Sequence, residues 1–301
     1  MSSAPSRTMT DMSELRFTKG HGTENDFVVV PDVDARLDLD ADLTRRLADR
    51  HAGVGGDGVI RVVPTAAATD ESVRAMADRA PWFMDYRNAD GSFAEMCGNG
   101  TRVFAAYLRR EGLETAGEFE IATRAGIKGI RFEGDVVATN MGRWHLPEEE
   151  KARADGFDAL VHVVGHGDPW SALSVDMGNP HTVVALPEDV DLGGLDLLHV
   201  PEVRPVPPHG TNVEFVRIIG PAHIAMRVHE RGVGETRSCG TGVCAAALAT
   251  SFWAGEAEPV QDWTVDVPGG RLRVRALPHH EVELAGPAAL VADGTIDLSS
   301  L

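Results

Sequence analysis

The amino-acid sequence predicts an α+β fold of two pseudo-symmetric domains, each a curled, mostly antiparallel sheet around a central helix. A length of 301 residues suits two domains of about 150 residues each. Two Gly-flanked cysteines, Cys97 and Cys239, occupy nearly the same place in the two halves, and each precedes an Ala-rich apolar run. Because helices that are apolar on all sides are buried, each run is expected to form the centre of a domain.

Further matches between the halves indicate an internal duplication. Asn88 precedes the first cysteine by the same number of residues as Glu230 precedes the second. Past each apolar run, a segment of alternating polar and apolar residues begins with a glycine, Gly126 in the first half and Gly270 in the second. Several matches in one order are typical of a repeated structural unit.

The remaining elements follow from local patterns. Leucines at helical spacing predict a helix over residues 40–51, and the two central helices are expected to end near Gly112 and Gly255, residues that suit a left-handed cap. Residues 268–270 predict a hairpin turn. Short apolar or β-branched runs predict strands at residues 27–30, 58–63, 82–86, 118–123, 136–139, 182–186, 213–218, 224–228 and 263–267.

The charge balance restricts the partners of this chain. Lys and Arg number 28 against 46 Asp and Glu, which gives a formal net charge of −18. Nucleic acid and anionic membrane are therefore unfavourable partners, and no apolar run approaches the ~20 residues of a membrane span. We expect a small-molecule substrate, and the sequence leaves a homodimer open.

Cysteine and lysine usage indicates a cytoplasmic protein without a metal or a cofactor. Three cysteines do not make the disulfide framework of a secreted protein, and residues 1–14 lack the apolar core of a signal peptide, which predicts a disordered leader. Cys239 and Cys244 point to different helix faces, there is no Cys-x-x-Cys, and three lysines offer few anchors for a Schiff-base cofactor. Cys244 is expected to be a core residue.

The two cysteine motifs predict acid–base chemistry at a carbon centre. A thiol at a helix start lies in the positive field of unpaired N–H groups, which lowers its pKa and favours the thiolate. The flanking glycines allow the backbone to approach an anion such as a carboxylate. Two such thiols on opposite sides of one carbon can remove a proton from one face and deliver a proton to the other. The pattern therefore predicts an enzyme that inverts a stereocentre.

Several blocks of the chain, taken in order, resemble the diaminopimelate epimerase family. They extend from about residue 17 to residue 286 and so cover nearly the whole chain. One departure is the sequence Gly56-Asp57-Gly58, where some relatives carry a Gln, so a side-chain contact to substrate is absent there or is made by backbone. The blocks are residues 22–27 (GTENDF), 88–92 (NADGS), 96–102 (MCGNGTR), 177–181 (MGNPH), 210–215 (GTNVEF), 230–236 (ERGVGET) and 239–242 (CGTG).

The resemblance implies a cofactor-independent isomerase that interconverts LL- and meso-diaminopimelate on the route to lysine and peptidoglycan. It implies Cys97 and Cys239 as the catalytic pair and His181 as a supporting residue. The substrate-binding residues that it implies are Asn25, Asn88, Gly98, Asn99, Asn179, Asn212, Glu230, Arg231, Gly240 and Thr241.

The charged segment at residues 147–150 (PEEE) is typical of a solvated connection and predicts that the two domains join near residues 142–151. The family resemblance adds a return of the chain. Its final strand, at about residues 288–298, is expected to return to the first domain. The N-terminal domain would then comprise residues 15–142 plus 286–301, and the C-terminal domain residues 143–285.

Alternatives remain open at this stage. A lone Cys beside Gly is usually a core residue, asparagines are common at turns, His181 can cap a turn, and Glu230–Arg231 can be a solvated pair. A proline or hydroxyproline racemase also uses paired cysteines. A thiol redox switch or binding module would use Cys97 and Cys239 to form a reversible disulfide instead.

Overall fold

The computed structural model describes residues 14–255 and 262–301, so the predicted leader at 1–14 lies outside the described residues except for Glu14. The described chain divides into two compact units. Within the described residues, unit 1 comprises 14–22, 26–132 and 288–301, and unit 2 comprises 23–25, 133–255 and 262–287.

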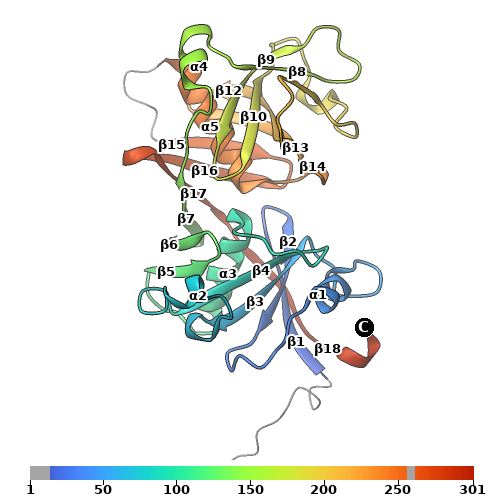
Figure 1. The fold of residues 1–301 in the computed structure, drawn as a ribbon, viewed down its shortest axis with the longest axis vertical. Coiled ribbons are helices and arrows are strands. Elements are labelled where there is room, and N and C mark those ends of the chain that lie inside the picture. Colours follow the sequence, from blue (N-terminus) through green and yellow to red (C-terminus); the bar gives the residue numbers. More distant parts are fainter. Residues whose placement is uncertain (1–13, 256–261) are drawn as a thin grey trace, which may run out of the picture. The chain divides into compact units, whose positions relative to one another are not determined.

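The helices and strands follow one another along the chain as Figure 1 labels them. The first half contains β1 (Glu14–Gly22), β2 (Asn25–Pro31), α1 (Ala41–Ala48), β3 (Gly58–Pro64), η2 (Thr65–Ala67), α2 (Glu71–Arg74), β4 (Trp82–Asn88), α3 (Gly98–Arg110), β5 (Glu118–Thr123) and β6 (Gly126–Glu133). The second half contains β7 (Val136–Arg143), α4 (Glu149–Asp155), β8 (Ala159–His162), β9 (Trp170–Asp176), β10 (Pro180–Ala185), η3 (Leu192–Gly194), β11 (Glu202–Arg204), β12 (Asn212–Gly220), β13 (His223–Glu230), β14 (Gly234–Thr236), α5 (Gly240–Ala254), β15 (Asp262–Val267), β16 (Gly270–Leu277), η4 (Pro278–His280), β17 (Glu281–Pro287), β18 (Ala289–Asp297) and η5 (Leu298–Ser300).

The two units repeat one strand topology, which confirms the predicted α+β fold. In unit 1, β2 pairs in parallel with β3, β3 pairs antiparallel with β4, and β4 pairs in parallel with β5. In unit 2, β10, β12, β13 and β15 make the same three kinds of pairing in the same order. Along the chain, α3 lies between β4 and β5, and α5 lies between β13 and β15. The strands of a parallel pair need such a long crossover connection. Antiparallel pairings such as β15–β16 and β16–β17 predominate elsewhere.

Both central helices begin after a cysteine and pack against the strands of their own unit. α3 contacts β1, β3, β4 and β18, and α5 contacts β9, β10, β12, β13, β15, β16 and β17. α5 is buried along nearly its whole length, and Cys244 within it is fully buried, as a core residue should be. The predicted ends also hold, because Gly112 and Gly255 have φ of 68° and 65°, the left-handed region in which glycine is favoured.

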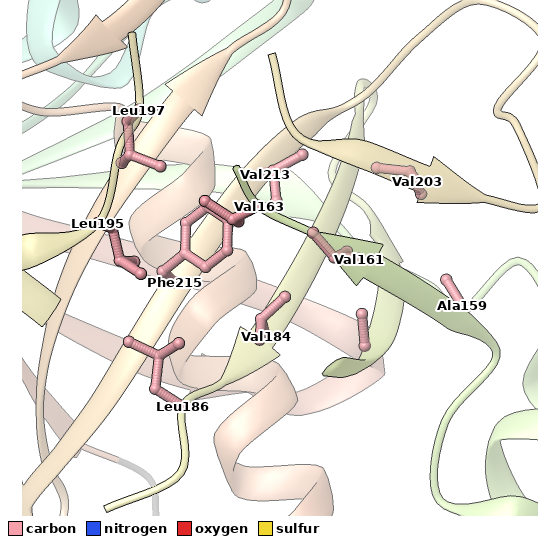
Figure 2. Close-up of a cluster of buried hydrophobic side chains, with 11 residues drawn as sticks. Ala159, Val161, Val163, Val184, Leu186, Leu195, Leu197, Val203, Val213 and Phe215 are labelled. Carbon is pink, nitrogen blue, oxygen red and sulfur yellow. The ribbon is translucent and has the colours of Figure 1, made fainter. Parts of the chain in front are cut away.

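One hydrophobic cluster of unit 2 packs around β12. Figure 2 shows Phe215 of β12 at the centre of this cluster, with Val184 of β10 and Leu195 and Leu197 packed around it. Successive side chains of a strand point to opposite faces. The neighbour of Phe215, Glu214, therefore points toward the helix, although it is also fully buried.

Two long-range pairings determine where the chain divides. β18 pairs antiparallel with β1, so the end of the chain returns to unit 1, as the family resemblance implies. β7 pairs antiparallel with β17 and belongs to unit 2, and the division falls between Phe132 and Glu133. The sequence pattern predicts the division after residue 142 instead, because no local pattern indicates that β7 pairs with a strand far along the chain.

Among the described helices, none combines the length and the apolar character that crossing a membrane requires.

The β15–β16 turn offers a test of the packing in unit 2. A Cβ on Gly269 would lie 1.9 Å from the backbone oxygen of Thr23, whose hydroxyl is 2.8 Å from that of Ser238, next to Cys239. We predict that Gly269→Ala lowers the stability of the protein by about 1–3 kcal/mol, because backbone must move to admit the methyl group. Calorimetry should show a melting temperature several degrees lower.

The matched control for this substitution is Gly167→Ala, where an added Cβ meets nothing within 4 Å. It should leave the melting temperature nearly unchanged. A Gly269→Ala variant as stable as the control would contradict the close approach of the turn to Thr23.

Candidate active site: two half-sites at helix starts

The half-site of unit 1 is built on the first turn of α3. Cys97 is the N-cap residue, in extended conformation with φ −139°, and its half-buried side chain accepts a hydrogen bond from Gly100 N at 3.4 Å. Its Sγ therefore lies among the first N–H groups of the helix, which carry partial positive charge. This is the placement that the sequence motif predicts.

Asn99 contributes to this half-site through its backbone rather than its side chain. The side chain is 1% exposed, and its Oδ1 accepts a hydrogen bond from Arg102 at 2.8 Å. Arg102 is itself fully buried and also donates to Gly98 O at 3.1 Å. The Asn99 amide oxygen is thus part of the support of the first helical turn, and the N–H groups of this turn are suited to hold a carboxylate.

Two further predicted residues of the first half, Asn25 and Asn88, lie at strand ends. Asn88 closes β4, and its amide donates to Ser92 Oγ at 3.0 Å. Asn25 opens β2 after two residues with positive φ, and it groups with unit 2. Gly58, opposite Asn88, cannot carry a larger side chain without movement, because a Cβ there would lie 2.5 Å from Arg87 O.

The half-site of unit 2 is built on the first turn of α5. Cys239 is the N-cap residue, with φ −116°, and its Sγ is 3.5 Å from the hydroxyl of Thr241. The residue is only 8% exposed. A Cβ on Gly242 would lie 2.6 Å from Glu214 Oε1, so the carboxylate of β12 sits directly against the helix start and a larger residue at 242 would displace it.

Burial reverses the electrostatic expectation for Cys239. Burial raises the pKa of its thiol well above the ordinary value, and the nearby carboxylates of Glu230 and Glu214 raise that pKa further. Thr241 and the Gly242 N–H lower it, but by less. The position of each thiol at a helix start, taken alone, predicts a lowered pKa for both cysteines. For Cys239 this prediction is wrong, because loss of water and two carboxylates outweigh the helix field.

Glu230 lies in the same buried surroundings as Cys239. Burial raises the pKa of its carboxyl group, and the charge of Glu214 adds to the rise, whereas a hydrogen bond from the Thr236 hydroxyl and the charge of His181 lower it. Glu230 is therefore not the solvated partner of Arg231 that the sequence left open. It belongs to the surroundings of Cys239.

A chain of hydrogen bonds connects β12 to the thiol of Cys239. His181 Nδ1 lies 2.7 Å from Glu214 Oε1, and His181 Nε2 lies 3.1 Å from Asn179 Oδ1. The Asn179 amide then donates to Thr241 Oγ1 at 3.4 Å, the same hydroxyl that contacts Cys239. Three predicted residues, Asn179, His181 and Thr241, thus come together with the cysteine in one network.

A second pair of predicted residues lies beside this network. Asn212 Oδ1 accepts a hydrogen bond from Arg231 N at 2.9 Å, and the Arg231 guanidinium donates to His209 O at 2.8 Å. The structure therefore holds Asn212 and Arg231 together at the ends of β12 and β13.

Glu214 and Thr236 also belong to the site, although the sequence motifs do not point to them. Both lie inside the family-like blocks, yet neither was given a role. The signal for Glu214 was a single acidic residue in the apolar strand Val213–Val216, because a fully buried carboxylate needs a partner. Thr236 carried no such signal, since a threonine beside a turn is ordinary.

Comparison with known proteins identifies the family of this chain. The diaminopimelate epimerase family matches it over residues 17–146 and 173–291. The diaminopimelate epimerase of Streptomyces coelicolor is 49% identical over 294 residues, which cover 95% of this chain and 96% of that protein. The enzyme of the same name from Thermobifida fusca is 47% identical over 295 residues, which cover 95% of this chain and 100% of that protein.

Solved structures share the fold at much lower identity. A hydroxyproline epimerase from Agrobacterium vitis superposes with a TM-score of 0.62 at 16% identity, covering 96% of this chain and 94% of that one. A PhzF-family phenazine biosynthesis protein from Bacillus anthracis superposes with a TM-score of 0.60 at 16% identity, covering 95% and 99%. These two likenesses show the fold alone. The family match and the sequence identities of 49% and 47% over nearly the whole length show the family as well. This chain belongs to the diaminopimelate epimerase family.

Proposed function

We propose that this chain interconverts LL- and meso-diaminopimelate, with Cys97 and Cys239 as the two groups that exchange protons with the α-carbon. The observation that carries the proposal is the matched placement of both cysteines as N-cap residues of equivalent central helices. Membership of a family whose members are named diaminopimelate epimerase supports the substrate. In the proposed active state, the two thiols face one stereocentre from opposite sides.

The proton balance of the reaction is simple. One cysteine, as thiolate, takes the α-proton and becomes a thiol, and the electron pair of the broken C–H bond passes toward the carboxylate. The opposite cysteine, as thiol, gives its proton to the other face of the carbon and becomes the thiolate. The raised pKa of Cys239 favours its thiol form. We therefore assign Cys97 as the base that begins the cycle and Cys239 as the proton donor.

The charge that develops on the substrate carboxylate needs compensation. The first turns of α3 and α5, at Gly98–Asn99 and Gly240–Thr241, present backbone N–H groups that can donate to it. This compensation takes the place of an electron-withdrawing cofactor, and the proposal includes none. Since the donors are fixed before the reaction, they stabilise the developing charge without reorganisation.

The far end of the substrate needs its own readers, because only one of two similar centres reacts. Arg231 can bind a distal carboxylate with two parallel hydrogen bonds, and Glu230 can accept from a distal ammonium group. The amides of Asn25, Asn88 and Asn212 can supply both donors and acceptors. A site with so many polar partners should reject amino acids that lack the second carboxylate and ammonium group.

The proposed role is in the biosynthesis of lysine and of peptidoglycan precursors, in the cytoplasm. Assembly as a homodimer stays open. The two other functions that the sequence leaves open, a proline racemase and a redox or binding module, are separated from the proposal by the experiment below.

We predict that the purified, reduced protein incorporates deuterium from deuterated water at one α-carbon of LL-diaminopimelate while meso isomer accumulates. NMR and chiral chromatography measure the two events. Exchange of proline faster than diaminopimelate would favour the racemase. Binding without exchange, or activity that requires oxidation, would favour the redox or binding module.

Replacement of either catalytic cysteine should abolish turnover without loss of fold. We predict that Cys97→Ser and Cys239→Ser each lower kcat by about 100-fold or more, because a hydroxyl is a far weaker acid than a thiol. The matched control is Cys244→Ser, which alters a buried cysteine in α5 away from the helix start. Near-normal kcat in either of the first two variants would contradict the two-base mechanism.

The facing of the two thiols can be tested directly. We predict that a mild oxidant inactivates the enzyme by joining Cys97 to Cys239, because two sulfur atoms that flank one carbon can meet when the site is empty. Peptide mapping without reduction identifies the bridge, and reductant should restore activity. Cys244→Ser should be inactivated like the parent protein, whereas a bridge that involves Cys244 instead would count against the geometry.

A further inference from the structure

The repeated topology gives a residue-by-residue equivalence between the two half-sites. In unit 1, Phe27 of β2 is in register with Gly58 of β3, and in unit 2, His181 of β10 is in register with Asn212 of β12. The residue two positions further along the second strand is Ile60 in unit 1 and Glu214 in unit 2.

The glycines of the helix starts confirm this equivalence. A Cβ on Gly100 of α3 would meet Ile60, Cys97 and Phe27. A Cβ on Gly242 of α5 would meet Glu214 and Cys239. Each helix therefore begins against the same strand position, but that position is apolar in unit 1 and carries a carboxylate in unit 2.

The buried pair His181–Glu214 thus stands where unit 1 has the hydrophobic pair Phe27–Ile60. All four residues are at most 1% exposed. The fold at this place does not need polar groups, since unit 1 forms it without them. In addition, Glu214 Oε2 is buried without a hydrogen-bond partner among the described residues.

The energetics favour a role other than stability for this pair. Moving two charged groups out of water costs more than their mutual attraction commonly returns, and well-packed apolar residues are often as stable or more stable. A carboxylate oxygen left without a partner adds to the cost. The pair therefore lowers stability relative to apolar residues, such as the Phe and Ile that fill the equivalent space in unit 1.

The position of the pair shows what it can act on. Glu214 Oε1 lies 2.7 Å from Nδ1 of His181 and Asn179 Oδ1 lies 3.1 Å from Nε2, so the ring links the carboxylate to the amide. The ring thereby holds the Asn179 amide, which reaches the hydroxyl that contacts Cys239. Removal of Glu214 would leave the ring without the partner that fixes its orientation.

We propose that Glu214 is a positioning residue of the Cys239 half-site. Glu214 holds His181 through Nδ1, and through His181 and Asn179 it holds the Thr241 hydroxyl at the thiol. The Glu214 carboxylate also places a negative charge beside the start of α5, whereas the equivalent residue at the start of α3, Ile60, is uncharged. The half-sites are therefore chemically unequal, and Glu214 makes them so. The consequence for turnover rests on the proposed epimerase function, whereas the consequence for the thiol does not.

The test uses three variants of the full chain and one control. Glu214→Gln keeps shape and an oxygen acceptor but removes the charge. Glu214→Ile leaves His181 buried without its partner, and the double variant His181→Phe/Glu214→Ile builds the arrangement of unit 1. The control is Asp158→Asn, another buried carboxylate of unit 2, which accepts from Ser174 N rather than contacting the site.

The main measurement is the alkylation rate of each cysteine by iodoacetamide as a function of pH, followed by mass spectrometry of the peptides. The charged and titratable groups around Cys239 are Glu230 of β13, Glu214 of β12 and His181 of β10. Because the Glu214 charge raises the pKa of this thiol, Glu214→Gln should shift the Cys239 profile to lower pH. The Cys97 profile should stay in place, and Asp158→Asn should move neither.

Stability and turnover give the second and third measurements. The double variant should melt at or above the temperature of the parent protein. Glu214→Ile alone should melt below it, since only the single variant leaves a buried imidazole whose Nδ1 has lost its partner. Both should lose kcat by at least about tenfold, the usual scale for loss of a group that orients a functional imidazole.

Two results would overturn the proposal. One is an unchanged Cys239 profile in both Glu214→Gln and Glu214→Ile, which would reduce Glu214 to a packing residue. The other is a double variant less stable than Glu214→Ile, which would make the pair a stabilising element. If the parent protein shows no exchange at diaminopimelate, the proposed function fails, while the alkylation profiles and melting temperatures still decide the role of Glu214.

Discussion

The close approach of β12 to the first turn of α5 is the constraint on which the rest of the second half-site depends. Gly242 has no side chain, so the Glu214 carboxylate can lie against the helix start. Cys239 is only 8% exposed, and a second carboxylate, Glu230 of β13, also lies in its surroundings. A helix start by itself favours thiolate, but here the burial that the packing imposes has the larger effect.

This balance bears on how a pair of identical side chains can have opposite roles. A two-base epimerase needs one thiolate and one thiol at the start of each cycle. Cys97 caps α3 beside the apolar side chains of Phe27 and Ile60, while Cys239 caps α5 beside Glu214. The two units share the same strand topology, and the residue at one strand position, Ile60 or Glu214, makes the two helix starts different in charge.

Much of the fold could be predicted from the sequence, because it depends on local patterns. The strands at 58–63 and 82–86 and the helix caps at Gly112 and Gly255 follow from apolar runs and glycines, and the structure confirms them. The division of the chain could not be predicted as well. It depends on the pairing of β7 with β17, and no local pattern states which distant strand will be a partner.

For the candidate site, the sequence by itself determined the two cysteines, their glycines and their place at the start of equivalent helices. These features are written in the chain as repeated motifs. Only the tertiary structure decided that the Asn99 side chain is bound to Arg102, that Glu214 lies against α5, and that the pKa of Cys239 is raised. The physical reason is that burial and the distance between charges arise from residues remote in sequence, so a motif can name a group but cannot give the field around it.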